Sequence, residues 1–322
     1  MQNSRTSALR YPEVIHTRES FMPPKHVIAV GHAALDYVYR IEAFPSSPTK
    51  IRALAHVASG GGMAANAAAA IARLGGGVSL WARIGDDPSG AIIRQQLDAV
   101  GVDTTHVRTC AGVSSATAAV IVDRNGERLV VSEDDHEFPL AADWLPIADI
   151  ANAGAVSSDL TWLEGTVAAF AAARAHNVPT VLDIDLNSGQ LLAKVLGLAD
   201  YAIFSAPAFR QFVSGASDEE RLATLVQSGI CHAGVTLGVN GYLWMTVNGK
   251  LCRQAAFPVE VVDTTGAGDA FHGAFAWAIS EGLKDAECAR IASAVAAISC
   301  TGLGARAGLP TRTALEQFLE AR

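Results

Sequence analysis

The stretch Asp263–Asp269 (Asp-Thr-Thr-Gly-Ala-Gly-Asp) has the residue types and spacing of an anion-binding turn. Glycines lack a Cβ atom, so the backbone N–H groups of Gly266, Ala267 and Gly268 can converge at a helix start, where the helix dipole also favours negative charge. A phosphoryl group is such an anion, and its transfer depends on positioning and charge neutralisation. The Asp269 carboxylate is then a candidate general base for an attacking hydroxyl group. The alternative is a tight turn in which Asp269 only caps its helix.

A buried helix must hold this turn in place. Apolar residues follow the turn at the three-to-four-residue spacing of a buried helical face, which predicts a helix over 267–281. A second glycine-rich turn, Gly60-Gly61-Gly62, is expected to open an alanine-rich helix that ends at Leu74. Asp36 is expected on the loop that follows a first buried strand, Lys25–Gly31.

The second half of the chain alternates short apolar strands with helices. The expected elements are strands 155–157, 180–183, 201–204 and 234–237, helices 162–176, 188–198 and 218–227, a hairpin of 243–247 with 250–257, and a final helix 285–301. Repeated strand–helix units predict a parallel sheet covered on both faces, a three-layer α/β/α core. We expect one domain over residues 26–322, preceded by a tail of residues 1–25.

Two further segments, about 37–58 and 116–131, predict a small separate sheet. The second contains Asn125-Gly126, a strong hairpin signal, and the first contains an expected strand at 51–58. We expect these strands to form a lid over the site that excludes water. Their exposed edges would be natural pairing surfaces for a homodimer.

Composition excludes several classes of function. The 322 residues are 50% hydrophobic and 17% charged, with a net charge of −8, which argues against nucleic-acid and anionic-membrane partners. The five cysteines are widely spread and contain no Cys-x-x-Cys, which indicates a reducing, cytoplasmic setting. Residues 1–25 lack the apolar run of a signal peptide or spanning helix. The histidines show no spacing that predicts a transition-metal site.

Two motifs together resemble one enzyme family. Asp263–Asp269 followed by Phe271 and Gly273, and Gly61–Ala67 followed by Leu74-Gly75, resemble the signatures of the ribokinase-like carbohydrate kinases, the PfkB family. The resemblance covers roughly residues 26 to 310. It implies ATP-dependent phosphorylation of a sugar hydroxyl, with Asp269 as the base and the Gly266, Ala267 and Gly268 amides as the anion hole.

The resemblance also implies roles for further residues. The implied sugar-binding residues are Asp36, Gly61, Gly62, Asn66 and Lys50; the implied nucleotide-binding residues are Thr236, Gly238, Asn240, Gly241 and Thr265. Asp263 and Thr265 match positions beside a monovalent cation, for which potassium is a candidate. Asp159 and Asp183 follow strands at the edge where open α/β sheets bind ligands, so they either line the site or cap helices. Asp183 is also a candidate to hold Mg²⁺ through water.

The chain departs from the family pattern at the metal. Members commonly carry Asn-x-x-Glu after the strand equivalent to 201–204, whereas this chain has a loop, Ser205-Ala206-Pro207-Ala208-Phe209. Magnesium would then depend on ATP phosphates, water and the nearby Asp183 or Asp185.

Within the family, the motifs are most similar to the sulfofructose kinase branch, and Lys50 matches a basic position of its substrate pocket. That branch places an Arg before a Trp to meet the sulfonate, where this chain has Thr161 before Trp162, and Ser132 replaces an Asn. A neutral Thr cannot make the bidentate contact of an Arg. The substrate is therefore expected to be a different, uncharged ketose or polyol.

Two other functions remain as alternatives. Gly60-x-Gly62-x-x-Ala65 also fits a dinucleotide fingerprint, with Asp86 as its acidic partner, which would indicate an oxidoreductase. The missing Asn-x-x-Glu would also suit a catalytically impaired binding module. The sequence contains no Walker A pattern, so a P-loop enzyme is not supported.

Overall fold

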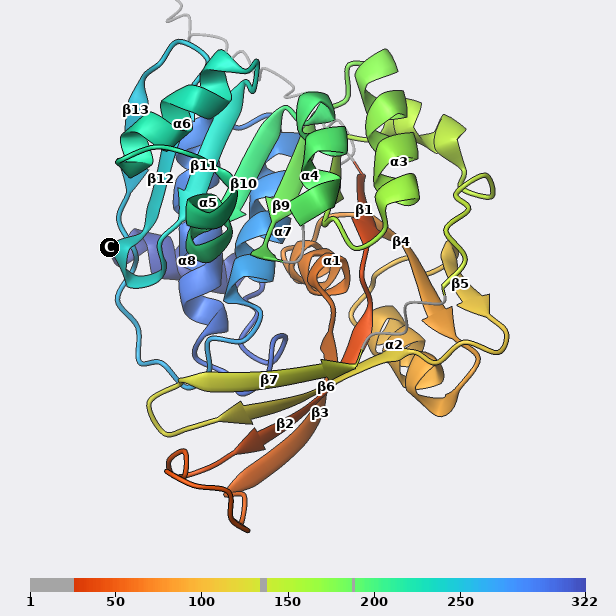
Figure 1. The fold of residues 1–322 in the computed structure, drawn as a ribbon, viewed down its shortest axis with the longest axis vertical. Helices are drawn as coiled ribbons and strands as arrows, with labels where there is room; N and C mark the ends of the chain where they lie inside the picture. Colours follow the sequence, from red (N-terminus) through yellow and green to blue (C-terminus); the bar gives the residue numbers. More distant parts are fainter. Residues whose placement is uncertain (1–25, 134–137, 187–188) are drawn as a thin grey trace, which may run out of the picture.

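The core of the protein is one large sheet. The computed structural model describes residues 26–133, 138–186 and 189–322. In these residues nine strands pair in the order β13-β12-β11-β10-β9-β8-β1-β4-β5 (Figure 1). The strands are β1 (Val27–Gly31), β4 (Val78–Gly85), β5 (Val107–Cys110), β8 (Ala155–Ser158), β9 (Thr180–Ile184), β10 (Tyr201–Ser205), β11 (His232–Thr236), β12 (Tyr242–Thr246) and β13 (Leu251–Gln254). The strands pair in parallel except for β12 and β13, which are antiparallel to their neighbours.

Helices cover both faces of this sheet. The α-helices are α1 (Met63–Arg73), α2 (Pro88–Ala99), α3 (Leu163–Ala175), α4 (Gly189–Val195), α5 (Ala206–Phe212), α6 (Asp218–Gln227), α7 (Ala267–Ser280), α8 (Asp285–Ser299) and α9 (Arg312–Glu320). Short 3-10 turns are η1 (Ile147–Asn152), η3 (Leu196–Leu198) and η4 (Gly238–Asn240). Figure 1 shows α3, α4, α5 and α6 on the near face, with α7 and α8 behind the sheet.

Strand β1 shows why both faces must be covered. Its residues alternate between two hydrophobic clusters: Val27 and Ala29 pack on the side of α1 and α7, and Ile28 and Val30 on the side of α3. Successive strand residues point to opposite faces, so a strand that is apolar throughout has to lie between two layers. The predicted three-layer α/β class with a mostly parallel sheet is confirmed.

A second, smaller sheet lies across one end of the core (Figure 1). Its order is β3-β2-β6-β7, formed by β2 (Ala34–Arg40), β3 (Ala55–Gly61), β6 (Ala116–Val122) and β7 (Arg128–Glu133). The predicted small sheet exists, but two details of the prediction are wrong. Asp36 lies inside β2 rather than on a loop, because this strand starts three residues after β1 ends. Gly60 and Gly61 end β3 instead of opening α1, since they pair with Leu35 and Ala34.

Three elements were not predicted. Strand β5 and helix α9 are short, and the expected loop at Ser205–Phe209 is the first part of α5. Ser205 caps α5 by accepting a hydrogen bond from the Ala208 amide at 3.4 Å, and Pro207 occupies its first turn. The expected tail, residues 1–25, lies outside the described residues. Across the described ranges, no helix has the length and apolar character needed to cross a membrane.

Candidate active site

The Asp263–Asp269 turn forms the start of α7, as its sequence predicted. Gly266 is the residue before the helix and has φ +75°, and a Cβ atom there would lie 2.5 Å from Ala305 Cβ. Glycine is therefore required for both the backbone conformation and the space. The Ala267 amide donates to Thr264 O at 3.3 Å. The amides of Gly266, Ala267 and Gly268 thus lie at the start of a helix, where backbone N–H groups and the helix dipole favour an anion.

Asp269 lies in the first turn of α7, and its carboxylate is hydrogen-bonded. Asn66 Nδ2 donates to Asp269 Oδ2 at 2.8 Å. The side chain is partly exposed, yet the surrounding protein removes enough water that burial raises the pKa of Asp269 to about 6. The Asn66 hydrogen bond opposes this rise, and the charges of Asp159, Asp36 and Asp185 add to it. A carboxyl group with this pKa is ionised at neutral pH and still basic enough to accept a proton.

The glycine signature places Asp36 beside this carboxylate. A Cβ atom on Gly61 would lie 2.2 Å from Asp36 Oδ1, so the Asp36 carboxylate packs directly over the glycine. Gly62 has φ +85°, and a Cβ atom there would lie 2.6 Å from Ala33 Cα. The chain can thus turn from β3 into α1 only with glycine at this position. Asp36 and Asn66 are both buried.

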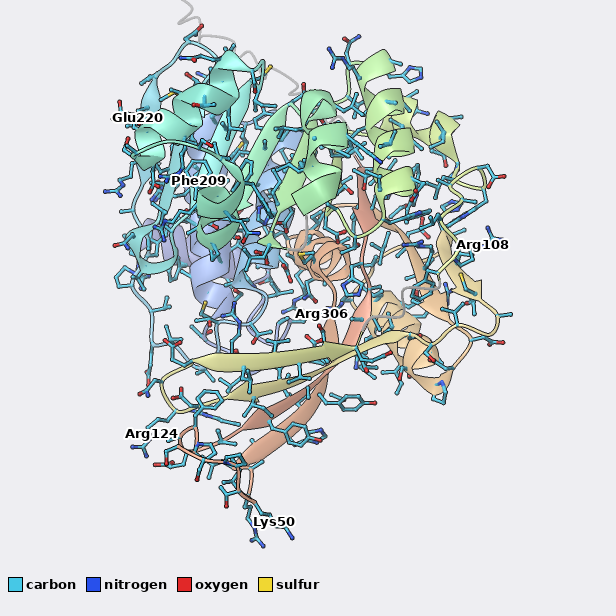
Figure 2. The ribbon with its side chains drawn as sticks, in the orientation of Figure 1. Lys50, Arg108, Arg124, Phe209, Glu220 and Arg306 are labelled. Atoms are coloured by element: carbon cyan, nitrogen blue, oxygen red, sulfur yellow. The ribbon has the colours of Figure 1, made fainter. Side chains whose placement is uncertain are left out.

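Arg306 joins the same cluster, although the sequence reasoning did not select it. Arg306 Nε donates to Asn66 Oδ1 at 2.8 Å, and Nη2 donates to Gly61 O at 3.1 Å. Figure 2 shows this side chain between the core and the small sheet. Burial lowers the pKa of Arg306 to about 10, opposed by the charges of Asp36 and Asp269. Arg306 is the basic residue of the segment Cys300–Gly308, and this was the signal that the sequence offered.

Asp263 fixes the turn rather than presenting a free carboxylate. Its Oδ1 accepts from the Thr265 amide and its Oδ2 from the Gly304 amide, each at 2.8 Å. Thr264 ties the turn to the small sheet, since its Oγ1 donates to Gly126 O at 3.2 Å and accepts from Arg128 Nη1 at 2.5 Å. Thr265 Oγ1 is buried without a hydrogen-bond partner in the described part of the chain. An orphaned hydroxyl oxygen of this kind is compatible with a ligand such as a cation.

Asp159 lies where the strand order reverses. Strands β1 and β8 are neighbours in the sheet. The strands that follow β1 lie on one side of this pair, and those that follow β8 lie on the other, which makes the pair a topological switch point. The buried Asp159 carboxylate accepts from the amides of His32 at 2.9 Å, Ala64 at 3.0 Å and Thr161 at 2.9 Å. It also accepts from Thr161 Oγ1 at 2.5 Å. Asp159 therefore fastens α1 to the ends of β1 and β8.

Asp183 lies at the end of β9, close to the start of α7. Burial, and then the charges of Asp269, Asp159 and Asp185, hold the pKa of Asp183 well above its usual value. His272 Nδ1 is 2.7 Å from Gly268 O and 3.1 Å from Asp183 Oδ2. Burial lowers the pKa of His272 to about 4, so its ring is neutral.

Asp185 is held by two donors and forms no preset metal cluster. Its Oδ1 accepts from the Leu186 amide at 2.8 Å and from Ser205 Oγ at 2.7 Å. Within the described ranges, no group of three or more His, Cys, Asp or Glu side chains is arranged to hold a metal ion directly.

The expected nucleotide segment follows β11. Thr236 ends this strand, and Gly238 and Asn240 lie in the short turn η4. Gly241 has φ +85°, and a Cβ atom there would lie 2.1 Å from Gln254 O, so the close turn requires glycine. Val239, between the predicted residues, is 92% exposed. The sequence analysis did not select this exposed apolar side chain.

The three residues that were compared with the sulfofructose kinase branch, Lys50, Ser132 and Thr161, do not lie together. Lys50 is exposed at the far tip of the small sheet and is not brought to the Asp269 cluster (Figure 2). Ser132 is exposed on β7. The Thr161 hydroxyl donates a hydrogen bond to Asp159. The guanidinium of Arg83 lies 4.5 Å from the centre of the Trp162 ring and donates a hydrogen bond to Pro139 O.

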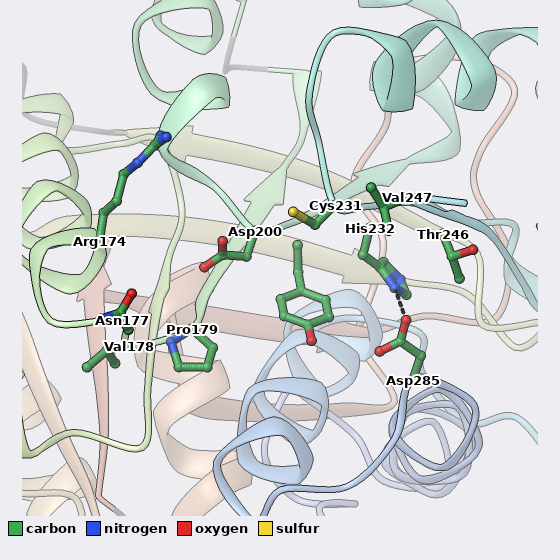
Figure 3. Close-up of a pocket in the computed structure, with 11 residues that line it drawn as sticks. Arg174, Asn177, Val178, Pro179, Asp200, Cys231, His232, Thr246, Val247 and Asp285 are labelled. Atoms are coloured by element: carbon green, nitrogen blue, oxygen red, sulfur yellow. Dashed lines mark hydrogen bonds and ion pairs between the residues drawn. The ribbon is translucent and has the colours of Figure 1, made fainter. Parts of the chain in front are cut away.

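A separate cavity of about 460 Å³ opens at the opposite edge of the sheet (Figure 3). It is lined by Arg174, Asn177, Val178, Pro179, Asp200, Tyr201, Cys231, His232, Thr246, Val247 and Asp285. His232 Nδ1 pairs with Asp285 Oδ2 at 2.9 Å, and Asp200 accepts from Thr180, so both carboxylates are already engaged. The cavity contains none of the predicted site residues.

Comparisons with known proteins agree with this geometry. Residues 24–312 match the model of the pfkB family carbohydrate kinases. The chain is 28% identical over 300 residues to a ribokinase of Bacillus subtilis, covering 92% of this chain and 99% of that protein. A candidate ribokinase from Agrobacterium tumefaciens superposes with a TM-score of 0.87 and 34% identity, covering 92% of this chain and 99% of the other. Arabidopsis thaliana ribokinase complexed with ribose and ATP superposes with a TM-score of 0.79 and 26% identity, over 93% and 99% of the two chains.

The chain belongs to the pfkB family of carbohydrate kinases. Its fold is the ribokinase-like α/β fold, and the predicted enzyme class, a carbohydrate kinase, is confirmed. The dinucleotide alternative does not fit, because the strand before Gly62 belongs to the small sheet and pairs antiparallel with β2. A dinucleotide fingerprint instead follows a strand of a parallel sheet.

Proposed function

We propose that this enzyme transfers the γ-phosphoryl group of ATP to a hydroxyl of a sugar or related polyol, with Asp269 as the general base. The observation that carries the proposal is the Asp269 carboxylate, whose pKa is raised to about 6, three residues after the αL glycine that starts α7. The Gly266, Ala267 and Gly268 amides at that start form the anion hole for the moving phosphoryl group.

Each group has a defined part in the reaction. Asp269 accepts the proton as the acceptor hydroxyl attacks phosphorus, a contribution of typically about 10²–10⁴ in rate. The helix start stabilises the negative charge of the transferring group. Asn66 keeps one N–H of its amide for the acceptor, because an amide has two and the other is bonded to Asp269.

We propose that the nucleotide binds over the turn that follows β11. We propose that Thr236, Gly238, Asn240, Gly241 and Thr265 bind ATP and that the exposed Val239 covers its base. Asp183 and Asp185 would hold Mg²⁺ through water, and this cation neutralises phosphate charge when bound. Burial, and then repulsion from Asp269 and the neighbouring carboxylates, raises the pKa of Asp183, and a cation at this place would relieve that repulsion. The buried Thr265 Oγ1 fits a monovalent cation such as potassium beside the anion hole.

The acceptor is proposed to be an uncharged sugar bound by Asp36, Gly61, Gly62 and Asn66. Asp36 accepts hydrogen bonds from hydroxyl groups, and the two glycines permit close approach. The Thr161 hydroxyl is committed to Asp159, so it offers no charge-assisted contact to a sulfonate. The resemblance to sulfofructose kinases, including the role of Lys50, therefore stays a prediction that an acceptor panel must test.

The small sheet is proposed to act as a lid and as a dimer interface. Thr264 already joins the β6–β7 turn to the anion hole, so closure of this sheet would act directly on the site. Strand β7 is an edge strand whose Leu129, Val130 and Val131 are 53%, 47% and 61% exposed. A second copy of this chain that paired along β7 would cover these apolar side chains. We also propose that residues 26–322 form one kinase domain that includes this lid.

The test is ADP release across a panel of ketoses, aldoses, nucleosides, deoxy-keto acids and sulfonated sugars, with ATP and Mg²⁺. We expect acceptor-dependent ADP release with an uncharged sugar. A second candidate, a catalytically impaired binding module, is motivated by the absence of Asn-x-x-Glu at the start of α5. Sugar binding by calorimetry without ADP release from any acceptor would favour that candidate.

A further inference from the structure

We infer that Arg306 is a positioning residue that couples the Gly60–Gly61 end of the small sheet to the catalytic carboxylate through Asn66. The inference rests on the proposed role of Asp269. It adds a residue outside both family signatures and assigns it a mechanical and electrostatic task.

The hydrogen bonds define one continuous path. Arg306 Nη2 donates to Gly61 O, Arg306 Nε donates to Asn66 Oδ1, and Asn66 Nδ2 donates to Asp269 Oδ2. A guanidinium group can only donate, so Asn66 must turn its carbonyl oxygen toward Arg306. Its amino group then faces Asp269. Arg306 thereby selects the amide orientation that presents a donor to the base.

Gly60 supplies the space for this arrangement. A Cβ atom on Gly60 would lie 2.0 Å from Arg306 Nη1 and 2.1 Å from Arg306 Cζ. The guanidinium thus packs on the bare backbone of β3. Nη1 is buried there without a hydrogen-bond partner in the described residues. An unpartnered buried donor costs stability, which is consistent with a side chain placed for a functional reason.

Arg306 also changes the electrostatics of the base. The charged groups around Asp269 are the carboxylates of Asp36 on β2, of Asp159 after β8, and of Asp183 and Asp185 at the end of β9, together with the guanidinium of Arg306. These carboxylates favour protonation of Asp269, and the guanidinium of Arg306 opposes it. Removing the charge of Arg306 should therefore raise the pKa of Asp269.

Two substitutions of Arg306 separate charge from orientation. Arg306→Gln removes the charge and the paired N–H donors of the guanidinium. We expect kcat/KM to fall by about 10–100-fold and the acid limb of its pH profile to move up by about one pH unit. Arg306→Lys keeps the charge but cannot make two directed contacts at once. We expect its acid limb to stay near the wild-type position while kcat falls by about 10-fold.

Gly60→Ala tests the same path without changing a charged residue. It should displace the guanidinium and lower kcat, and combined with Arg306→Gln it should add little, because both changes break one path. The control is Gly197→Ala, at an exposed glycine with open space around its Cβ position. This control should match the wild type in kcat, KM and pH profile.

Carbon-13 NMR titration of the Asp269 carboxyl group gives a readout that does not require turnover. We expect its midpoint to rise in Arg306→Gln and to stay in place in Arg306→Lys and Gly197→Ala. If the wild type is active and Arg306→Gln keeps the wild-type midpoint and pH profile, the inference about Arg306 is wrong while the proposed function stands. Fully additive effects of Gly60→Ala and Arg306→Gln would overturn it too. Failure of the wild type to phosphorylate any acceptor would instead count against the proposed function.

Discussion

Asn66 Nδ2 donates a hydrogen bond to Asp269 Oδ2 at 2.8 Å, although 203 residues separate the two in sequence. Asn66 lies in α1 within the first glycine signature, and Asp269 lies in α7 as the last residue of the second signature, Asp263–Asp269. The bond stabilises the ionised carboxylate and lowers the Asp269 pKa against the effect of burial. The two signatures therefore meet at one hydrogen-bonded pair, which we propose to accept the proton of the attacking hydroxyl group.

The pH profile should report this unit. Because Asp269 must be ionised to accept a proton, kcat/KM should fall about tenfold per pH unit below the Asp269 pKa of about 6. Asn66→Ala removes a hydrogen bond to the charged form, so the acid limb should move to higher pH. Steady-state kinetics from pH 4.5 to 8 measure both profiles. An acid limb that moves to lower pH in Asn66→Ala would contradict the assignment.

Gly61→Ala should weaken acceptor binding. The new Cβ atom would lie 2.2 Å from Asp36 Oδ1, so the carboxylate must move away. We expect KM for the sugar to rise by about tenfold or more while KM for ATP changes little. Two-substrate kinetics check this, with Gly197→Ala as the control. A variant with raised KM for ATP alone would show that Asp36 does not serve the acceptor.

Gly273→Ala should destabilise the contact between α1 and α7. A Cβ atom there would lie 2.4 Å from Ala67 O and 2.8 Å from Ala67 Cα, which are backbone atoms of the facing helix. Overpacking of this kind costs about 1–3 kcal/mol. Urea unfolding measures the loss, and Gly197→Ala should unfold at the wild-type midpoint. A Gly273→Ala variant as stable as this control would show that the helices separate without cost.

Val131→Glu should weaken self-association. We expect a dimer through β7, where Val131 is 61% exposed on the sheet edge, and a buried unpaired carboxylate would oppose pairing. Sedimentation velocity at several concentrations measures the change. Val247→Glu is the matched control, since Val247 is also 61% exposed but lies after β12 of the large sheet, outside the small sheet. A monomeric wild type, or equal effects of both substitutions, would rule out the β7 interface.

Local patterns predicted much of the fold. The expected helix 218–227 matches α6, because local propensity and the cap at Ser217 decide its limits. Asp36 was misplaced on a loop because β2 gains its strand conformation from pairing with β3 and β6, which are distant partners. The proline-containing stretch at Ser205–Phe209 forms a helix since Ser205 caps it and proline is tolerated in a first turn.

The sequence predicted the geometry of the turn before α7, because a short motif determines it. Gly266–Asp269 needed only a turn and a helix start. Arg306 escaped prediction because its partners, Asn66 and Gly61, are about 240 residues away in sequence. Lys50, selected by analogy to a substrate pocket, is exposed at the tip of the small sheet. Long-range side-chain contacts of this kind depend on the assembled fold, which no local pattern contains.

Replacement of the proposed base tests the central claim most directly. Asp269→Asn keeps the shape of the side chain but cannot accept the proton of the attacking hydroxyl. The measurement is the single-turnover rate of ADP formation with saturating ATP, Mg²⁺ and the best acceptor of the panel. We predict a rate about 10²–10⁴ lower than that of the wild type, with ATP affinity retained. A variant that turns over at the wild-type rate would contradict the assignment of Asp269 as the catalytic base.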